Sequence, residues 1–204
     1  MATAVASPPL EALFRDLAFE AKALVDSKLT SACSDAQSID QLVMPRNDGM
    51  PRCWDKHSNS MWVEVDPESK EFKLVEGHLR QTLQTTVRTV KVLRIQNEKI
   101  FKTFSRDTAE SIMFHGCKSE ANEGSIVAHG FSLSTCKSLV NDQRGVWFSH
   151  TSEYSNRSFA FSDTNGWRHL FVCIVSKHGL LKNDGQMRVV DQFGAYPQWI
   201  VHYQ

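Results

Sequence analysis

The residues best placed to do chemistry lie in one stretch, from Ile112 to Phe131 (IMFHGCKSEANEGSIVAHGF). It opens with a short apolar run, long enough for one buried strand but too short for a helix, which stops at His115-Gly116. A histidine at a strand end therefore sits beside a residue without a side chain. Because glycine lets a flat ligand lie against the main chain, its N–H and C=O can serve as a donor and acceptor pair. The alternative is that His115 is a hydrogen-bonded histidine of the core.

Two local signals place a helix directly after this histidine. Ser119 is typical of a helix N-cap, and Gly130 of the residue that follows a helix. A strand, His-Gly, a helix and Gly-Phe together would form one compact wall of a pocket.

Four further stretches accompany FHG in a fixed order. They are LRIQN at 93–97 with Ile100 and Phe101, GVWFSHTSEYS at 145–155, DTNGWRHLFV at 163–172, and AYPQWIV at 195–201. The ordered set resembles the catalytic domain of poly(ADP-ribose) polymerase (PARP)-type ADP-ribosyltransferases, in a divergent form of the mono-transferring branch. The resemblance runs over residues 61–204 and is far more specific than any one motif.

The resemblance implies an α+β fold of the PARP and diphtheria-toxin type, with mixed, mostly antiparallel sheets and a few short helices. The pattern of many short strands and few helices agrees, because it lacks the strand-helix alternation of a doubly wound fold. We expect residues 1–60 to form an N-terminal helix and polar linker, and residues 61–204 to form the catalytic domain.

Periodicity predicts the elements that position the pocket. An amphipathic helix is expected from about Pro9 to Lys28, and a polar connecting loop at 30–60. The loop between Phe131 and Gly145 is expected to lie over the pocket. Strands are expected at 62–65, 87–95, 112–115, 168–175, 186–190 and 198–203, and helices at 76–86 and after Asn97.

The resemblance assigns roles in binding NAD, which is the substrate of this family. Gly116 would hold the nicotinamide carboxamide through its backbone, and Ser155 would hydrogen-bond the same group. His115 would hold the adenosine ribose 2′-OH. Tyr154 is expected to line the same NAD site.

An aromatic ring should stack on the nicotinamide. Counting back from Asn165-Gly166 gives Phe159, whereas counting forward from Trp147 lands one place later, on Ala160. Phe161 is the fallback. Stacking needs only a π face, so phenylalanine can serve where the family usually has tyrosine. Packing in the core is the alternative for each aromatic residue.

Two of the three expected catalytic positions, His115, Trp147 and Gln186, depart from the family pattern. Trp147 stands where the family has tyrosine, which replaces a phenol O–H by an indole N–H in another place. Counting back without gaps from AYP at 195–197 puts Gln186 where polymer-forming members have glutamate. A glutamine carries no charge to stabilise a ribosyl cation or to activate a hydroxyl, so chain elongation is not expected.

These residues lead to one functional hypothesis and two alternatives. The hypothesis is an NAD-dependent mono-ADP-ribosyltransferase that modifies protein side chains. The main alternative is a catalytically inactive PARP-like pseudoenzyme that acts as a binding or scaffold module. A third is NAD hydrolysis, or transfer to a nucleic-acid end.

Composition limits the partners of the chain. Its 204 residues are 41% hydrophobic and 23% charged, with a formal net charge of zero and a pI of about 7.1. A neutral chain has no general attraction for nucleic acid or for an anionic membrane. No apolar run approaches the 18 residues of a membrane helix. NAD and protein acceptors are the partners that the resemblance implies, and composition adds that we expect no membrane and that nucleic acid is not an expected partner.

The N-terminal residues and the cysteines favour a nuclear or cytoplasmic protein. Residues 1–25 lack the basic start and continuous apolar run of a secretory signal, and their acidic residues argue against a mitochondrial presequence. The five cysteines are scattered and fit reduced thiols. Cys53 and His57 have the spacing of half a metal site, but no second pair follows, so no metal is expected.

Overall fold

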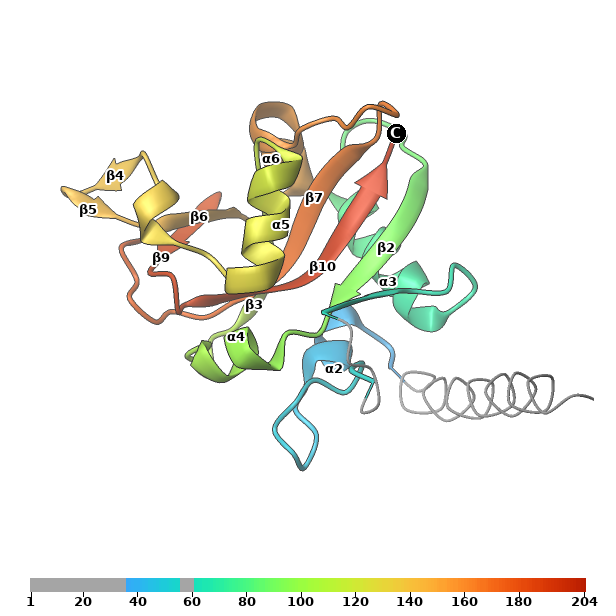
Figure 1. The fold of residues 1–204 in the computed structure, drawn as a ribbon, viewed down its shortest axis with the longest axis horizontal. Coiled ribbons are helices and arrows are strands. Elements are labelled where there is room, and N and C mark those ends of the chain that lie inside the picture. Colours follow the sequence, from blue (N-terminus) through green and yellow to red (C-terminus); the bar gives the residue numbers. More distant parts are fainter. Residues whose placement is uncertain (1–35, 56–60) are drawn as a thin grey trace, which may run out of the picture.

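The computed structural model describes residues 36–55 and 61–204 (Figure 1). The helix expected from Pro9 to Lys28 lies outside these residues. The helices are α2 (Ile39–Val43), α3 (Lys70–Gln81), α4 (Glu98–Thr103), α5 (Glu120–His129) and α6 (Ser152–Phe159), with a 3₁₀ turn, η1 (Leu133–Thr135). The strands are β1 (Trp62–Glu64), β2 (Thr89–Ile95), β3 (Ser111–His115), β4 (Leu139–Val140), β5 (Gln143–Arg144), β6 (Val146–Ser149), β7 (Arg168–Val175), β8 (Lys182–Asn183), β9 (Met187–Val190) and β10 (Ala195–Tyr203).

Eight of these strands form one sheet in the order β1-β2-β10-β7-β3-β6-β9-β8, and β4 pairs with β5 in a separate hairpin. Every pairing in the large sheet is antiparallel. The predicted α+β class with a mainly antiparallel sheet and few helices is thus confirmed. In the described part of the chain, no helix is both long and apolar enough to cross a bilayer.

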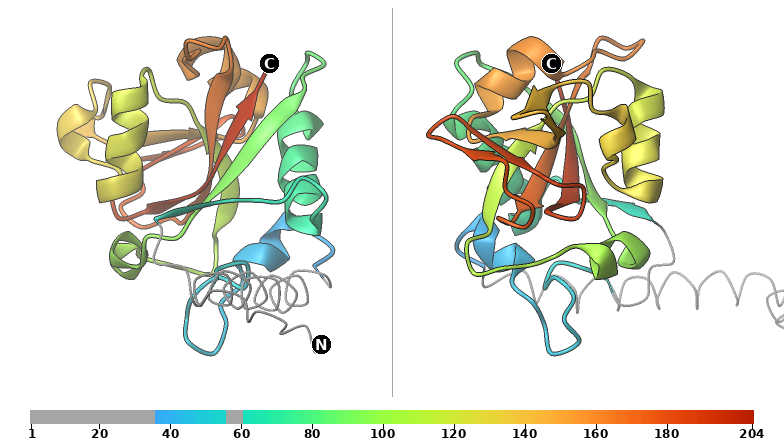
Figure 2. Two further views of the ribbon diagram at one scale, coloured as in Figure 1. Left: turned by 45° about the vertical axis from the view of Figure 1, so that its right-hand side comes forward. Right: turned by 90° about the vertical axis from the view of Figure 1, so that its left-hand side faces the viewer.

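Helices cover both faces of this sheet (Figure 2). The side chains of β10 show the division, because alternate residues of a strand point to opposite faces. Trp199 donates its indole N–H to Glu71 of α3, whereas His202, three residues further on, stacks on His169 beside Glu123 of α5. Helix α3 therefore lies on one face and α5 on the other.

The predicted caps fix the helices that flank the central strand. Asn97 accepts the N–H of Ile100 at the start of α4, and Ser119 accepts the N–H of Asn122 at the start of α5. Gly130 ends α5 with φ at +78°, a conformation that only glycine adopts without strain. The sequence predicted these two helix starts and the end of α5 correctly, because short-range side-chain to backbone bonds determine them.

The helix predicted at 76–86 was placed too late in the chain. It is α3, at Lys70–Gln81, and it begins where the hydroxyl of Ser69 accepts the N–H of Phe72. Its buried side includes Phe72 and Leu79, while Leu83 lies past its end and is only partly buried. The predicted start was too late because the sequence analysis did not recognise Ser69 as the N-cap of this helix.

The connecting loop expected at 30–60 includes a short helix in the part that the structure describes. Residues 39–43 form α2, and Trp54 is buried with its ring 5.1 Å from that of Phe101 and 5.8 Å from that of Tyr196. The polar composition concealed a few apolar side chains that complete the core. The division of the chain at residue 60 stays a prediction.

The segment between Phe131 and Gly145 has more structure than the predicted loop. It holds η1 and the β4–β5 hairpin, whose two-residue turn has positive φ at both Asn141 and Asp142. This is the turn geometry that two-residue hairpins favour. The hairpin projects beyond the sheet, on the left in Figure 1.

A buried ion pair ties α3 to the sheet. The guanidinium of Arg94 lies 2.6 Å from one carboxylate oxygen of Glu71, and the other oxygen accepts the indole N–H of Trp199 at 2.8 Å. All three residues are buried. A buried charge is costly unless it is paired, and Glu71 supplies the opposite charge for Arg94, whose Nε also donates to the side chain of Gln96.

We predict that Glu71→Ala lowers the free energy of unfolding by about 3–5 kcal/mol, because it removes the carboxylate that pairs with a buried guanidinium. Chemical denaturation measures the loss. Glu76→Ala is the control on the same helix, since it breaks the partly exposed pair with Arg80 and should cost at most about 1 kcal/mol. Equal losses for the two variants would contradict this account of Arg94.

Candidate functional site

Strands β3 and β6 separate at the point where the predicted site begins. They pair only through Phe114 and Ser149, and the same register would next bring Gly116 opposite Trp147. That pairing is absent: the C=O of Trp147 lies 2.9 Å from Nδ1 of the His115 ring instead. Among residues 36–55 and 61–204, neither the N–H nor the C=O of Gly116 has a hydrogen-bond partner. The structure thus leaves a free backbone donor and acceptor beside His115.

The contact with Trp147 also determines which nitrogen of His115 is protonated. A carbonyl oxygen only accepts, so Nδ1 must carry the proton. Burial lowers the pKa of His115, and the Trp147 carbonyl only partly offsets this effect. The ring is therefore neutral near pH 7, and its Nε2 is a hydrogen-bond acceptor. Such a nitrogen can accept a hydrogen bond from a sugar hydroxyl.

Aromatic side chains hold the His115 ring in place. Its centroid lies 5.1 Å from that of Phe131, 5.4 Å from that of Phe148 and 6.3 Å from that of Phe171. Phe131 begins the segment that was expected to cover the pocket. These contacts come from three separate elements, so they fix the ring more firmly than one neighbour could.

Gly116 packs tightly against the end of α6. A Cβ atom added to it would lie 2.6 Å from Cβ of Phe159 and 2.9 Å from the backbone nitrogen of Ala160. The lack of a side chain therefore serves close packing within the protein, on this side of the residue. It brings Phe159 directly beside the free backbone groups of Gly116.

Of the two candidate stacking rings, Phe159 is the more exposed. It is 38% exposed, and its ring centroid lies 5.9 Å from that of Tyr154 on the same helix. Phe161 is partly buried against the core, and its ring packs 4.5 Å from the ring of His169. The geometry thus favours Phe159, with Tyr154 as its neighbour.

Ser155 lies next to the predicted contact but faces the protein. It is buried, and its hydroxyl donates to the C=O of Phe114 at 3.3 Å. Phe114 is two residues before Gly116. Ser155 therefore braces the end of β3 in this structure, and its contact with a carboxamide stays a prediction.

Trp147 lies in β6 opposite Val189 of β9, whereas Gln186 comes just before β9, and the surroundings of the two side chains differ. The indole Nε1 of Trp147 is buried without an acceptor among the described residues, and the ammonium of Lys182 lies 5.6 Å from the indole ring. Gln186 is exposed at the start of β9, where its C=O accepts the N–H of His150 at 3.0 Å. Gln186 and Tyr154 line the same cavity, of about 260 Å³.

A chain of contacts therefore joins most of the predicted residues. His115 binds the Trp147 carbonyl, Gly116 packs on Phe159, Phe159 lies beside Tyr154, and Tyr154 shares a cavity with Gln186. These residues come from the ends of β3 and β6, from the residue before β9 and from α6, and Tyr154 is the one that joins the cavity to Phe159 and Gly116.

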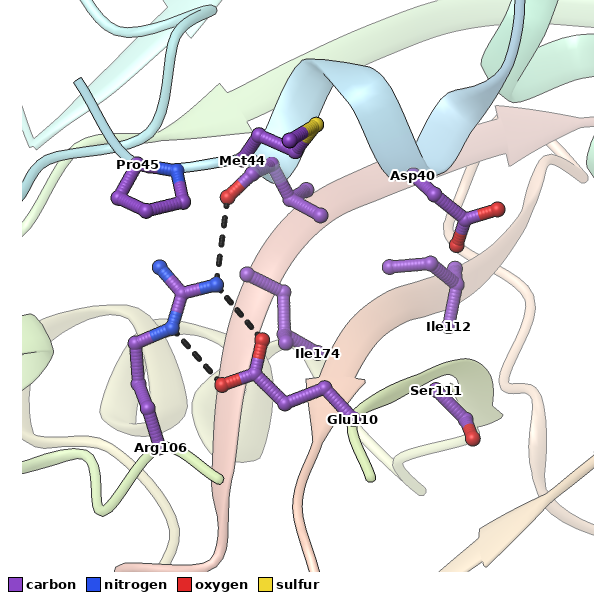
Figure 3. Close-up of a pocket in the computed structure, with 9 residues that line it drawn as sticks. Asp40, Met44, Pro45, Arg106, Glu110, Ser111, Ile112 and Ile174 are labelled. Carbon is purple, nitrogen blue, oxygen red and sulfur yellow. Dashed lines mark hydrogen bonds and ion pairs between the residues drawn. The ribbon is translucent and has the colours of Figure 1, made fainter. Parts of the chain in front are cut away.

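A second cavity, of about 140 Å³, is separate from this surface (Figure 3). It lies at the Ser111 end of β3, whereas His115 is at the other end. Arg106 crosses its edge, pairing with Glu110 and reaching the C=O of Val43. Because it is at the far end of the strand, this cavity is not part of the candidate site.

A buried cluster on the other helical layer holds α5 to the sheet. Nδ1 of His169 lies 2.8 Å from Glu123, and its Nε2 lies 3.4 Å from Asp163. The ring of His202 stacks on that of His169 at 3.7 Å. Ligand atoms of Glu123, His169 and His202 are close enough to suggest a metal centre. However, one ion cannot lie in the planes of two stacked rings, so the cluster is better described as an ion pair with a stacked neutral histidine.

Sequence reasoning missed Glu153 and Arg157, which line the cavity beside Gln186. They form an i,i+4 ion pair on α6, a helix that the sequence analysis did not predict. The E-Y-S-N-R spacing was the available signal, since residues four apart meet on one helix face.

We predict that Gly116→Ala lowers the free energy of unfolding by about 1–3 kcal/mol, because the new methyl group must displace the main chain at the end of α6. Gly124→Ala in α5 is the control: a Cβ there meets nothing within 4 Å, and alanine should stabilise the helix by up to about 1 kcal/mol. Chemical denaturation compares the two. A neutral effect at position 116 would contradict the packing described for Phe159.

The pH dependence of stability should report on His202. Burial, with His169 and Lys91 nearby, lowers the pKa of His202 to about 4 from an ordinary 6.5, while Asp163 acts in the opposite direction. The unfolded chain therefore takes up this proton first, and stability falls as the pH drops from about 6.5 to about 4.

The His202→Gln variant lacks this titrating group. Its melting temperature should therefore fall less than that of the wild type between about pH 6.5 and pH 4, while the other titrating groups act equally in both proteins. Thermal unfolding of both proteins between pH 8 and pH 4 tests the prediction. Parallel curves would contradict it.

Comparison with known proteins identifies the family. Residues 69–189 match the family model described as the poly(ADP-ribose) polymerase catalytic domain, which is more than half of the chain. The chain is also 25% identical over 195 residues to a probable poly [ADP-ribose] polymerase of Dictyostelium discoideum, an alignment that covers 76% of this chain. It spans 57% of the length of that relative. With the antiparallel sheet and the His-Gly strand end already described, the family match shows that the chain belongs to the poly(ADP-ribose) polymerase family.

Proposed function

We propose that this protein is an NAD-dependent mono-ADP-ribosyltransferase that modifies protein side chains and does not extend the product into a chain. The observation that carries the proposal is the free N–H and C=O of Gly116, beside a neutral His115. A carboxamide offers both an N–H donor and a C=O acceptor, so it can satisfy both backbone groups at once.

The remaining groups fit the other parts of the dinucleotide. The exposed ring of Phe159 can stack on a nicotinamide held by Gly116, and Tyr154 extends the aromatic surface. Nε2 of His115 can accept a ribose hydroxyl. These assignments rest on position and chemistry, together with the family's use of NAD.

The reaction breaks the bond between nicotinamide and C1′ of the ribose. Positive charge builds on the ribose, as in glycoside cleavage, and the pyridinium nitrogen takes the electron pair of the bond. A firm grip on the carboxamide fixes the leaving group, while the acceptor attacks C1′. Proximity and orientation are thus the main contributions of His115 and Gly116.

The lack of a carboxylate at position 186 is the reason for proposing a single transfer. A carboxylate about 4 Å from a cation is worth on the order of 4 kcal/mol at an effective dielectric of 20, or roughly three decades in rate. The side chain of Gln186 offers no charge to activate the hydroxyl of a bound ADP-ribose. Elongation therefore lacks a carboxylate at this position, and a carboxylate elsewhere in the cavity would act on an acceptor held in a different place.

A pseudoenzyme is the second candidate, and one observation favours it. The buried indole N–H of Trp147 has no acceptor among the described residues, and the indole stands where the family has a phenol. If the ring fills space that nicotinamide needs, the domain binds partners without catalysis. A nuclear or cytoplasmic location is proposed for either candidate.

Incubation with labelled NAD and protein acceptors tests the proposal. We predict one ADP-ribose per modified site, and an increase in melting temperature with NAD. His115→Ala should abolish both labelling and the shift, while Gln186→Glu should raise turnover or permit short chains. A ladder of products from the wild type would refute the single transfer. An absence of both labelling and shift would favour the pseudoenzyme.

A further inference from the structure

The cavity that contains Gln186 also contains a carboxylate that the family pattern does not assign. Besides Tyr154 and Gln186, its lining consists of Thr82, Gln84, Thr151, Glu153 and Arg157. Glu153 is one residue before Tyr154 on α6. The charge that is missing at position 186 is therefore present elsewhere in the same hollow.

Two contacts hold this carboxylate in place. One oxygen of Glu153 accepts the backbone N–H of Gln84 at 3.0 Å, and the other pairs with Nε of Arg157. Only 9% of Glu153 is exposed, whereas the side chain of Arg157 is 67% exposed. The hydrogen bond from Gln84 is the largest of the effects that lower the pKa of Glu153, so the group is ionised at neutral pH. It is a fixed negative charge that needs no reorganisation when substrate arrives.

We propose that this cavity receives a hydroxyl-bearing side chain of the acceptor protein, and that Glu153 supplies there the carboxylate that position 186 lacks. The proposal rests on the proposed transferase function and names the acceptor class and a catalytic residue for it. Gln186 then marks only the edge of the acceptor subsite.

The chemistry of a hydroxyl acceptor matches the lining. The acceptor oxygen forms a bond to C1′ as the C1′–N bond breaks, nicotinamide leaves with the electron pair, and the hydroxyl proton passes to the Glu153 carboxylate and then to water. The low pKa makes Glu153 a weak base in the ground state. The proton becomes acidic only as the oxygen bonds to the cationic ribose, so a weak base in the correct position is sufficient.

Charge favours a hydroxyl over an acidic acceptor. The lining carries one negative and one positive charge, and its other groups are neutral hydroxyls and amides. An incoming carboxylate would meet the like charge of Glu153, whose cationic partner is turned largely to solvent. A neutral serine or threonine hydroxyl meets hydrogen-bonding groups and a base.

The test uses the full chain, labelled NAD, and three peptides that differ only in a central serine, alanine or glutamate. Wild type should modify the serine peptide and leave the other two unmodified. Glu153→Gln keeps the size of the side chain and its bond to Gln84, and should lower the initial rate by roughly 10²-fold. The affinity for NAD should change less than twofold. Glu76→Gln, in the i,i+4 pair with Arg80 on α3, is the matched control and should leave the rate unchanged.

A second substitution separates catalysis from structure. Adding Gln186→Glu to Glu153→Gln returns a carboxylate to the cavity and should restore the rate to within tenfold of wild type. If Glu153 had only a structural role, a carboxylate at position 186 would not restore the rate. Glu153→Asp moves the charge back by one methylene and should lower the rate at least tenfold. This variant decides the question if Glu153→Gln does not fold.

The outcomes are distinct. Transfer to serine that is unchanged in Glu153→Gln or Glu153→Asp overturns the role of Glu153 and leaves the transferase function standing. Transfer to the glutamate peptide alone overturns the acceptor class. No transfer by the wild type to any peptide, with no affinity for NAD, overturns the proposed function and this inference together.

Discussion

The hydrogen bond between the His115 ring and the carbonyl of Trp147 is the interaction on which the candidate site depends. In a regular antiparallel ladder that carbonyl would face the main chain of Gly116, and the edge of the sheet would be closed. Because an imidazole takes its place, β3 and β6 separate after a single pair, and Gly116 keeps two unused polar groups. This one hydrogen bond between a side chain and the backbone thus orients His115 and leaves the backbone N–H and C=O of Gly116 free to bind a ligand.

This opening is stable because the sheet around it is held from both faces. On one face α3 is tied by the buried pair of Arg94 and Glu71, and on the other α5 is tied by His169 and Glu123. Each contact joins a helix to the inner strands β2, β7 or β10, away from the place where β3 and β6 separate. The charges that stabilise the frame are therefore distinct from the groups that would meet a ligand.

Sequence reasoning succeeded where the determinants were local. The caps at Asn97 and Ser119 were predictable because each is a short-range bond. It failed where distant residues decide the outcome: nothing near Trp54 in the sequence indicates that it packs on Tyr196. The site shows the same contrast. The sequence identified His115 and Gly116 and put Phe159 before Phe161, but it could not show that the ring of His169, on β7, packs against Phe161.

The two departures from the family pattern that the resemblance implies, at Trp147 and Gln186, concern side chains, whereas the structure shows what their backbone groups do. Trp147 acts on His115 through its carbonyl, and Gln186 through its carbonyl holds the N–H of His150, so either side chain can differ without moving the strands. The backbone contacts that would position a dinucleotide are therefore independent of the side-chain charge that would promote transfer. A chain built in this way could lack a carboxylate at one position and still keep the backbone geometry of the site. On our proposal the negative charge in the cavity then comes from Glu153, at another position along the sequence.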